Sequence, residues 1–224
     1  LLLYAVGLPP HAALGTGALA VSANAFINFA GHARAGNVRW AVAAIFSAAG
    51  AIGAFAGSTL GKAVDGQRLI LLFAGMMIFI GITMLRPRKA AGSGHVELTP
   101  VVIAKVLATG LGVGMLSGFF GIGGGFLIVP GLILATGMTM LNAVGTSLFA
   151  VGVFGLTTAL NYAVSGLVEW SIAAEFIIGG ILGGQLGMRA AIRLSADRNM
   201  LNRIFAGIVF VVAAYIIWRS AFHA

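Results

Sequence analysis

A glycine-rich segment at 121–125 is the first part of this chain whose residues could do chemistry. It reads Gly-Ile-Gly-Gly-Gly, and Pro130 follows within an otherwise apolar stretch. Consecutive glycines let backbone N–H groups approach a ligand without obstruction, and the N-terminus of a following helix attracts anions. The segment therefore predicts either an unwound anion site or a packing kink. The candidate donors are the backbone N–H groups of Gly121, Gly123, Gly124 and Gly125.

Two nucleotide-binding motifs share this glycine content, and neither fits. A dinucleotide fingerprint needs a third glycine where Phe126 stands, a strand before the motif and an acid after it. A phosphate loop of the Walker type needs a lysine directly after its glycines.

Polar side chains within apolar stretches form a second group of candidates. Hydroxyl groups in membrane helices often bond the preceding turn, so a single one needs no functional explanation. Asn24 and Asn28 are four residues apart and share one helix face, where they could line a pathway. We predict that Thr16, Thr146 and Ser147 supply the neutral donors of an anion site. The full set is Thr16, Ser22, Asn24, Asn28, Thr146, Ser147, Thr157, Thr158 and Asn161.

Catalytic and metal-binding groups are sparse. Lys105 and Glu175 lie near the ends of their apolar stretches, where their charges reach water, although Glu175 could also couple transport to protons. The four histidines show no metal-ligand spacing, and the chain has no cysteine. No Ser/His/Asp arrangement converges. We expect no enzyme activity, no cofactor and no metal site.

The elements that must position these residues are membrane helices. Hydrophobic residues make up 60% of the 224 residues and charged residues 8%, and the mean hydropathy is +1.06. Water-soluble domains carry about 25% charged residues, so this chain cannot cover a soluble globule with charge. The net charge of +8 does not indicate nucleic-acid binding, because Lys and Arg cluster between apolar runs, as in membrane loops.

Span lengths predict an all-α integral membrane protein with about eight spanning or partly spanning helices. About 20 apolar residues cross the hydrocarbon core of a bilayer. Glycines and a proline break helices, so we expect the helix at 119–136 to be broken. The predicted helices cover 12–30, 40–61, 69–85, 101–117, 119–136, 142–164, 170–189 and 203–218.

An internal repeat relates residues 130 positions apart. Duplicated apolar halves are typical of secondary transporters, whose sites lie where the repeats meet. We assign 1–86 to the first repeat, 87–99 to a linker and 100–224 to the second. The counterpart of 119–130 would precede Leu1, so we expect the first repeat to lack its N-terminal glycine-rich element in this chain. Matching pairs include Gly15 with Gly145, Thr16 with Thr146, Trp40 with Trp170 and Gly50 with Gly180.

The positive charges predict that the two repeats are inverted. An inverted arrangement places ten of the thirteen Lys and Arg residues on the side of the 86–105 segment, whereas a parallel one divides them almost evenly. Cytoplasmic loops carry the excess of positive charge, so the linker is predicted to be cytoplasmic. The ten are Arg34, Arg39, Arg86, Arg88, Lys89, Lys105, Arg189, Arg193, Arg198 and Arg203.

Glycines spaced by four residues predict close helix contacts. This spacing places small residues on one helix face, which lets two backbones approach each other in lipid. The predicted contacts involve Gly53 and Gly57, then Gly110, Gly114 and Gly118, and finally Gly179, Gly183 and Gly187 with the parallel pair Gly180 and Gly184.

Two motifs in the second half carry a resemblance to a known family. They are 121–130, Gly-Ile-Gly-Gly-Gly-Phe-Leu-Ile-Val-Pro, and 142–147, Asn-Ala-Val-Gly-Thr-Ser, with partners at 8–16 and 36–38 in the first half. With these motifs the chain resembles, over nearly its whole length, the TauE/SafE family of membrane anion permeases, which includes sulfite and organosulfonate exporters. The resemblance implies a multi-pass protein of the bacterial inner membrane. The family carries the glycine-rich element in both halves, whereas this chain shows it once.

We therefore expect a secondary transporter that exports a small sulfur-containing anion, such as sulfite or a sulfonate. Its partners would be the anion, the lipid bilayer and a coupling proton or Na⁺, and an oligomer is compatible with the sequence. One alternative is a passive anion channel, whose flux would not saturate or depend on a proton gradient. Another is a non-transporting membrane scaffold or receptor domain, which needs neither a broken helix nor a polar interior.

The predicted topology can be tested with a single introduced cysteine. The chain has no cysteine of its own, so Ser93→Cys creates the sole thiol. In intact cells it should resist an impermeant thiol reagent, and after the membranes are opened it should react. Ready labelling of intact cells would reverse the predicted orientation.

Overall fold

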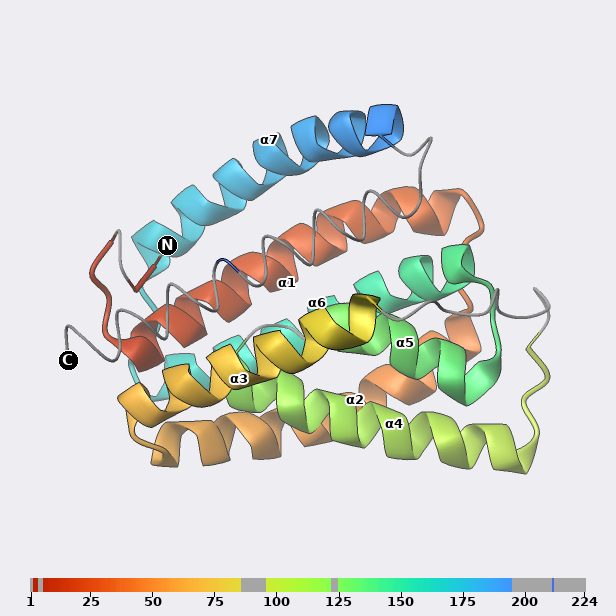
Figure 1. Cartoon of the computed structure of the whole chain (residues 1–224), viewed down its shortest axis with the longest axis horizontal. Helices are drawn as coiled ribbons and strands as arrows, with labels where there is room; N and C mark the ends of the chain where they lie inside the picture. Colours follow the sequence, from red (N-terminus) through yellow and green to blue (C-terminus); the bar gives the residue numbers. More distant parts are fainter. Residues whose placement is uncertain (1, 4–5, 86–95, 122–124, 195–210, 212–224) are drawn as a thin grey trace. The chain divides into compact units, whose positions relative to one another are not determined.

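A computed structural model describes residues 2–3, 6–85, 96–121, 125–194 and 211 (Figure 1). Side chains are described for these residues except 79–85, 126 and 185–194. Every regular element in the described part of the chain is a helix. The helices are α1 (Pro10–Arg34), α2 (Trp40–Ala63), α3 (Gly66–Leu85), α4 (Pro100–Phe120), α5 (Gly125–Thr136), α6 (Met140–Val164) and α7 (Trp170–Leu194).

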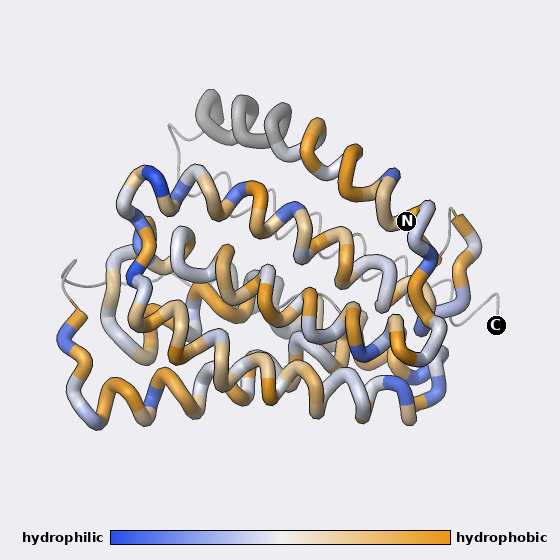
Figure 2. Tube along the Cα trace, turned by 180° about the vertical axis from the view of Figure 1, so that it is seen from behind, coloured by the Kyte–Doolittle hydropathy of each residue, from blue (hydrophilic) through white to orange (hydrophobic). Residues whose placement is uncertain are grey.

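The predicted all-α membrane architecture is confirmed. Among the described residues, α1, α2, α4 and α6 are long and apolar enough to cross a bilayer. Hydrophilic residues gather mainly towards the helix ends, and apolar residues dominate the middles (Figure 2). Seven of the predicted helices have counterparts, and the eighth, at 203–218, lies outside the described residues apart from residue 211.

The chain divides into two compact units. One comprises 1–63 and 90–180, and the other comprises 64–89 and 181–224. The first unit holds α1, α2, α4, α5, α6 and the beginning of α7, and the site described below lies entirely within it. The second unit contains α3, which begins where Asp65 Oδ1 accepts hydrogen bonds from the N–H groups of Gln67 and Arg68. The repeat boundaries and the cytoplasmic location of the linker stay predictions.

Helix boundaries follow the 130-residue repeat. The pairs α1 and α6, and α2 and α7, start 130 residues apart. Gly36 has φ 72° after α1, and Gly166 has φ 69° after α6. Glycine adopts a positive φ without steric cost, so it ends each helix and turns the chain toward the next one. The same local conformation therefore recurs at equivalent positions in the two halves.

Contacts between α1 and α6 establish that the two copies run in opposite directions. A Cβ on Gly15 would lie 2.7 Å from Tyr162 Cβ, near the end of α6. A Cβ on Gly152, near the middle of α6, would lie 2.7 Å from the Phe26 ring. Ser22 Oγ donates to Gly152 O at 2.7 Å. Residue numbers rise along α1 as they fall along α6, so these equivalent helices are antiparallel. Two equivalent helices that both span the bilayer can be antiparallel only if the repeats are inverted.

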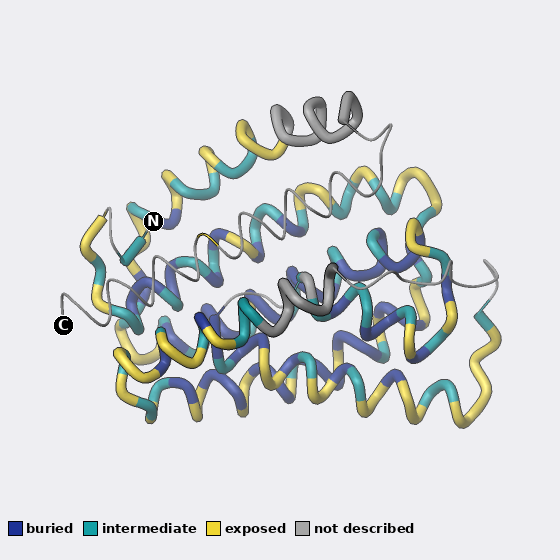
Figure 3. Tube along the Cα trace, in the orientation of Figure 1, coloured by how far each residue is buried: buried dark blue, intermediate teal, exposed yellow. Residues whose placement is uncertain are grey.

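Glycines bring the backbones of α2 and α4 into direct contact (Figure 1). A Cβ added to Gly110 would lie 2.8 Å from Phe46 O, and one added to Gly114 or Gly118 would overlap the backbone of Gly50 or Ala54. The predicted close contacts are thus confirmed for Gly110, Gly114 and Gly118, and equally for Gly53 and Gly57. Both helices show a buried face beside an exposed one (Figure 3).

Two of the α7 glycines predicted to make close contacts, Gly179 and Gly180, belong to the first unit, and Gly180 makes such a contact. A Cβ on Gly180 would overlap the Asn24 side chain of α1. One on Gly179 would meet no described atom within 4 Å. The face of α7 that contains Gly180 therefore packs closely against α1, whereas no described residue makes the expected contact at Gly179.

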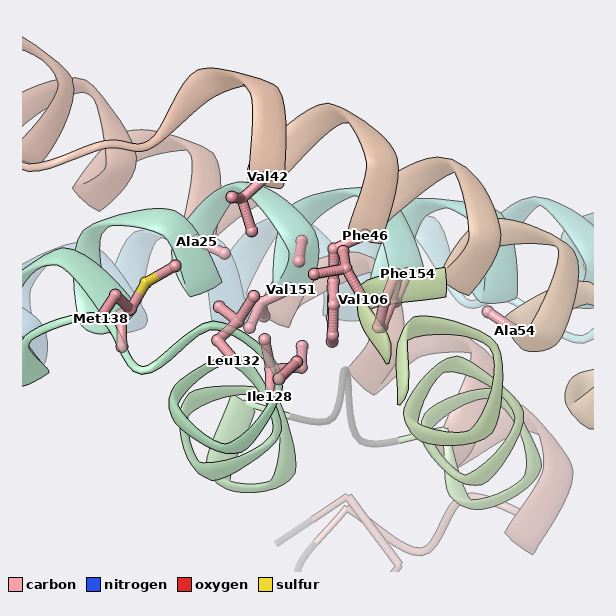
Figure 4. Close-up of a cluster of buried hydrophobic side chains, with 13 residues drawn as sticks. Ala25, Val42, Phe46, Ala54, Val106, Ile128, Leu132, Met138, Val151 and Phe154 are labelled. Carbon is pink, nitrogen blue, oxygen red and sulfur yellow. The ribbon is translucent and has the colours of Figure 1, made fainter. Parts of the chain in front are cut away.

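Buried apolar side chains from α2, α4, α5 and α6 meet in one cluster (Figure 4). Phe46 of α2 and Phe154 of α6 stack with their ring centroids 5.8 Å apart. Val106 of α4 and Ile128 of α5 join the same cluster, and all four side chains are fully buried. This packing holds the short helix α5 between α4 and α6.

Two alanine substitutions in α4 separate packing from helix propensity. Gly114→Ala should lower the thermal midpoint in detergent, because its methyl group would overlap Gly50 and overpacking costs ~1–3 kcal/mol. Gly112→Ala is the matched control, since its Cβ would meet nothing within 4 Å. The control should be neutral or slightly stabilising, because alanine favours a helix over glycine by about 1 kcal/mol. Equal midpoints for the two variants would contradict the packing shown here.

Candidate functional site

The predicted helix break is confirmed by the left-handed conformation of Gly121. Helix α4 ends at Phe120, and Gly121 takes the left-handed conformation with φ 64° and donates its N–H to Gly118 O. Helix α5 begins at Gly125. The predicted donors Gly123 and Gly124 lie outside the described residues. Gly121 and Gly125 therefore mark the two ends of the break.

Helix α5 starts near the middle of its neighbours. A Cβ on Gly125 would lie 3.5 Å from Val151 Cγ2, and Val151 is close to the centre of the 25-residue helix α6. Further along, a Cβ on Gly131 would lie 3.5 Å from Val113 Cγ2 of α4. Twelve residues extend only about 18 Å, too short for a bilayer core of about 30 Å. Since α6 crosses the bilayer, the N-terminus of α5 lies at depth.

This N-terminus is a local source of positive potential. The first four N–H groups of a helix lack partners within the helix, and the aligned peptide dipoles place about half a positive charge there. Gly125 contributes no side chain that would cover its N–H group. The arrangement can bind an anion without a charged side chain.

Ser147 lies on the face of α6 that contains Val151 and meets α5. It precedes Val151 by one helical turn, and residues four apart share a helix face. Its side chain is buried, and its hydroxyl donates to Val144 O at 2.8 Å. The hydroxyl oxygen can still accept, and a rotation about χ1 would free its hydrogen for a ligand. Ser147 thus lies on the face of α6 that packs against α5, one turn from Val151, and its role as an anion donor stays a prediction.

Thr16 and Thr146 instead join the two repeats. Thr16 Oγ1 accepts from the N–H of Glu169 at 3.0 Å, and Thr146 Oγ1 accepts from the N–H of Arg39 at 3.1 Å. Both threonines are fully buried. Thr146 is the counterpart of Thr16, and Glu169 is the counterpart of Arg39. Thr16 therefore binds the residue before α7 in the second repeat, and Thr146 binds the residue before α2 in the first.

Asn24 and Asn28 both bond the backbone of their own helix, α1. Asn24 Nδ2 donates to Ala20 O at 2.9 Å, and Asn28 Nδ2 donates to Asn24 O at 2.8 Å. Asn28 is exposed, while Asn24 Oδ1 is buried and accepts no hydrogen bond in the described part of the structure. The two amides share a face of α1 as expected, but that face meets Gly180 of α7.

Several buried hydroxyl groups lack a described partner; Thr158 is among the polar candidates from the sequence, whereas Ser117 and Tyr162 are not. Those of Ser117, Thr158 and Tyr162 have no hydrogen-bond partner among the described groups, and all three side chains are fully buried. Ser117 follows Val113 by one turn of α4, so it shares the face that meets α5 and lies one turn nearer the break. Thr158 follows Phe154 by one turn on the face of α6 that meets α2. Sequence alone gives these hydroxyls no distinction from those that bond their own helix.

A multi-pass helical bundle with inverted repeats and a half-length helix beginning at depth is the architecture of a membrane transporter. The family model described as "Sulfite exporter TauE/SafE" matches residues 1–216, so the chain belongs to the TauE/SafE family. No solved structure matches the chain.

Two relatives illustrate the range of similarity. A "Probable membrane transporter protein" of Xylella fastidiosa (strain 9a5c) is 54% identical over 98% of this chain and 85% of its own length. The "Probable membrane transporter protein YdhB" of Bacillus subtilis (strain 168) is 26% identical over 81% of this chain and 75% of its own. Both names describe transporters, and both organisms are bacteria, as expected from the predicted inner-membrane location.

The paired threonines generate a stability prediction. Thr16→Val and Thr146→Val should each lower the thermal midpoint by a similar amount, because each leaves a backbone N–H without its partner, at a cost of ~1–3 kcal/mol. Thr157→Val serves as the control, since its hydroxyl bonds Val153 O within α6. If scanning calorimetry gave all three variants the wild-type midpoint, the two hydrogen bonds would have no structural role.

Proposed function

We propose that this protein is a secondary transporter that exports a small sulfur-containing anion, such as sulfite or a sulfonate. The observation that carries the proposal is the N-terminus of α5, which begins beside Val151 near the middle of α6. A helix N-terminus at membrane depth is unfavourable in lipid, and it is tolerated where protein, a ligand or a watery cavity meets it. An anion satisfies both its free N–H groups and its dipole.

The surroundings of this N-terminus favour an anion over a cation. The faces of α4 and α6 that meet α5 carry the buried hydroxyls of Ser117 and Ser147, which can donate to oxyanion oxygens. Among the described residues, no buried polar side chain is an acid that would repel an anion or hold a metal ion. Binding by dipoles and neutral donors, without an arginine, would also be weak enough to permit release.

The inverted repeats support transport by alternating access. In such folds, the substrate site lies where the repeats meet, and each half moves relative to the other to open one side at a time. The α1–α6 contact and the two threonine hydrogen bonds belong to that junction. A gradient of protons or Na⁺ would drive the movement. Saturable flux that responds to such a gradient would exclude a passive channel.

The choice of a sulfur-containing anion rests on the description of the family, which names a sulfite exporter. Tetrahedral and pyramidal oxyanions present several acceptor oxygens to the N–H and O–H donors around Gly125. A scaffold or receptor domain would need neither the broken helix nor the unpartnered hydroxyls, so these features favour transport.

Anion-dependent stabilisation tests the site directly. Purified protein would be titrated with sulfite, sulfate, thiosulfate, sulfoacetate and taurine, and the thermal midpoint followed. Gly125→Val should weaken the preferred anion roughly tenfold or more, because its side chain would crowd the first N–H groups and each hydrogen bond to a charged acceptor contributes ~1.5–3 kcal/mol. Gly131→Val is the matched control, since an added Cβ has the same 3.5 Å clearance two turns further along α5.

Two outcomes would count against the proposal. If none of the five anions raised the wild-type midpoint, the substrate class would be wrong. If Gly125→Val folded and kept wild-type affinity for the preferred anion, that anion would bind away from the N-terminus of α5.

A further inference from the structure

A lysine-centred cluster joins the C-terminal ends of α2 and α6. Lys62 Nζ donates to Asn161 Oδ1 and Ser165 Oγ, each at 2.9 Å, and to Asn161 O at 3.0 Å. Asn161 Nδ2 in turn donates to Ser58 Oγ at 2.7 Å. These partners are all neutral oxygens, and within the described part of the chain no carboxylate pairs with Lys62. The ammonium charge is therefore solvated by the protein but not neutralised.

Tyr162 lies against this cluster with an unsatisfied hydroxyl. The side chain is fully buried, and its hydroxyl has no hydrogen-bond partner among the described groups. Lys62 Nζ lies 5.9 Å from the centroid of the tyrosine ring. The hydroxyl oxygen would be 3.4 Å from a Cβ on Gly61, the residue before Lys62. A buried hydroxyl without an acceptor is costly, so this group is prepared to donate to a ligand.

The cluster lies beside the helix break. A Cβ on Gly61 would lie 2.7 Å from Phe119 O, two residues before Gly121. On α6, Thr158 precedes Tyr162 by one turn, and Val151, which contacts the start of α5, lies about two turns before Thr158. Tyr162 and Thr158 thus lie on one face of α6, between the Lys62 cluster and Val151, which contacts the start of α5.

An oxyanion matches the chemistry of this cluster. Its oxygens would take over N–H donors of Lys62 that now bond Ser165 and Asn161, and charge-assisted hydrogen bonds are shorter and stronger than those to neutral oxygens. Tyr162 would supply a further donor. A divalent cation would be repelled by the ammonium group. No described carboxylate would compete with an oxyanion for that ammonium group.

We propose that Lys62, Asn161 and Tyr162 form a second anion subsite of the transport pathway. The inference rests on the proposed function and assigns this subsite the same oxyanion class as the N-terminus of α5. Because α2 and α4 run in the same direction, Lys62 lies at the end of the unit opposite to the start of α4, the helix that follows the 87–99 linker in sequence. In an exporter with that linker in the cytoplasm, the subsite receives the anion on the release side. Successive weak sites let an ion leave one position for the next.

Sulfite titration of three variants tests the subsite. Tyr162→Phe removes a hydroxyl that bonds no described group, so it should keep the anion-free thermal midpoint and still lower the affinity for sulfite at least fivefold. Lys62→Met should lower the affinity for sulfite at least tenfold. Lys105→Met is the charge control, because Lys105 is an exposed lysine of α4 near the opposite end, and it should bind sulfite as the wild type does.

The outcomes separate this inference from the proposed function. If wild-type protein does not respond to sulfite, both are overturned for this anion. If Gly125→Val lowers the affinity for sulfite while Tyr162→Phe and Lys62→Met bind it as the wild type does, only the subsite is overturned. If the Lys62 and Tyr162 variants lower the affinity for sulfite and Gly125→Val does not, the subsite stands and the placement of the anion at α5 is wrong. Should Lys62→Met fail to fold, Tyr162→Phe decides.

Discussion

Hydrocarbon offers no hydrogen bonds, so each backbone N–H and C=O at membrane depth must find a partner inside the protein. The described elements are all helices for this reason, and the interruption between Phe120 and Gly125 is the exception that needs support. That support comes from α4 and α6, which flank α5, and from the apolar cluster in which Ile128 is fully buried. The body of α5 is therefore held between α4 and α6 by apolar packing.

Close backbone contact supplies the rigidity for this enclosure. Lipid chains are as apolar as leucine, so burial of apolar area does not drive two helices together in a membrane. Contact must come from shape, and the glycines of α2 and α4 remove the side chains that would keep the backbones apart. Large apolar residues such as Ile52, Phe55 and Leu134 remain exposed, as expected for surfaces that face lipid.

Inverted symmetry explains why equivalent residues have equivalent partners. Thr16 reaches the start of α7, and Thr146 reaches the start of α2, through hydrogen bonds of nearly equal length. Within the described residues, the half-length helix α5 has no counterpart in the first repeat. The candidate anion site at Gly125 therefore uses α5, whereas the cluster around Lys62 is formed by α2 and α6, one helix from each repeat.

Much of this architecture could be predicted from residue types alone. Apolar run lengths, the 130-residue repeat and the clustered glycines determined the membrane class, the helix order and the break, because lipid imposes these constraints locally along the chain. The sequence could not separate hydroxyls that bond their own helix, such as Thr157, from those left without a partner, such as Thr158. It also could not show that Thr146 bonds the backbone of Arg39, or that Lys62 meets Asn161 rather than a carboxylate. Those differences depend on which face of one helix meets which residue of another, and only tertiary packing decides that.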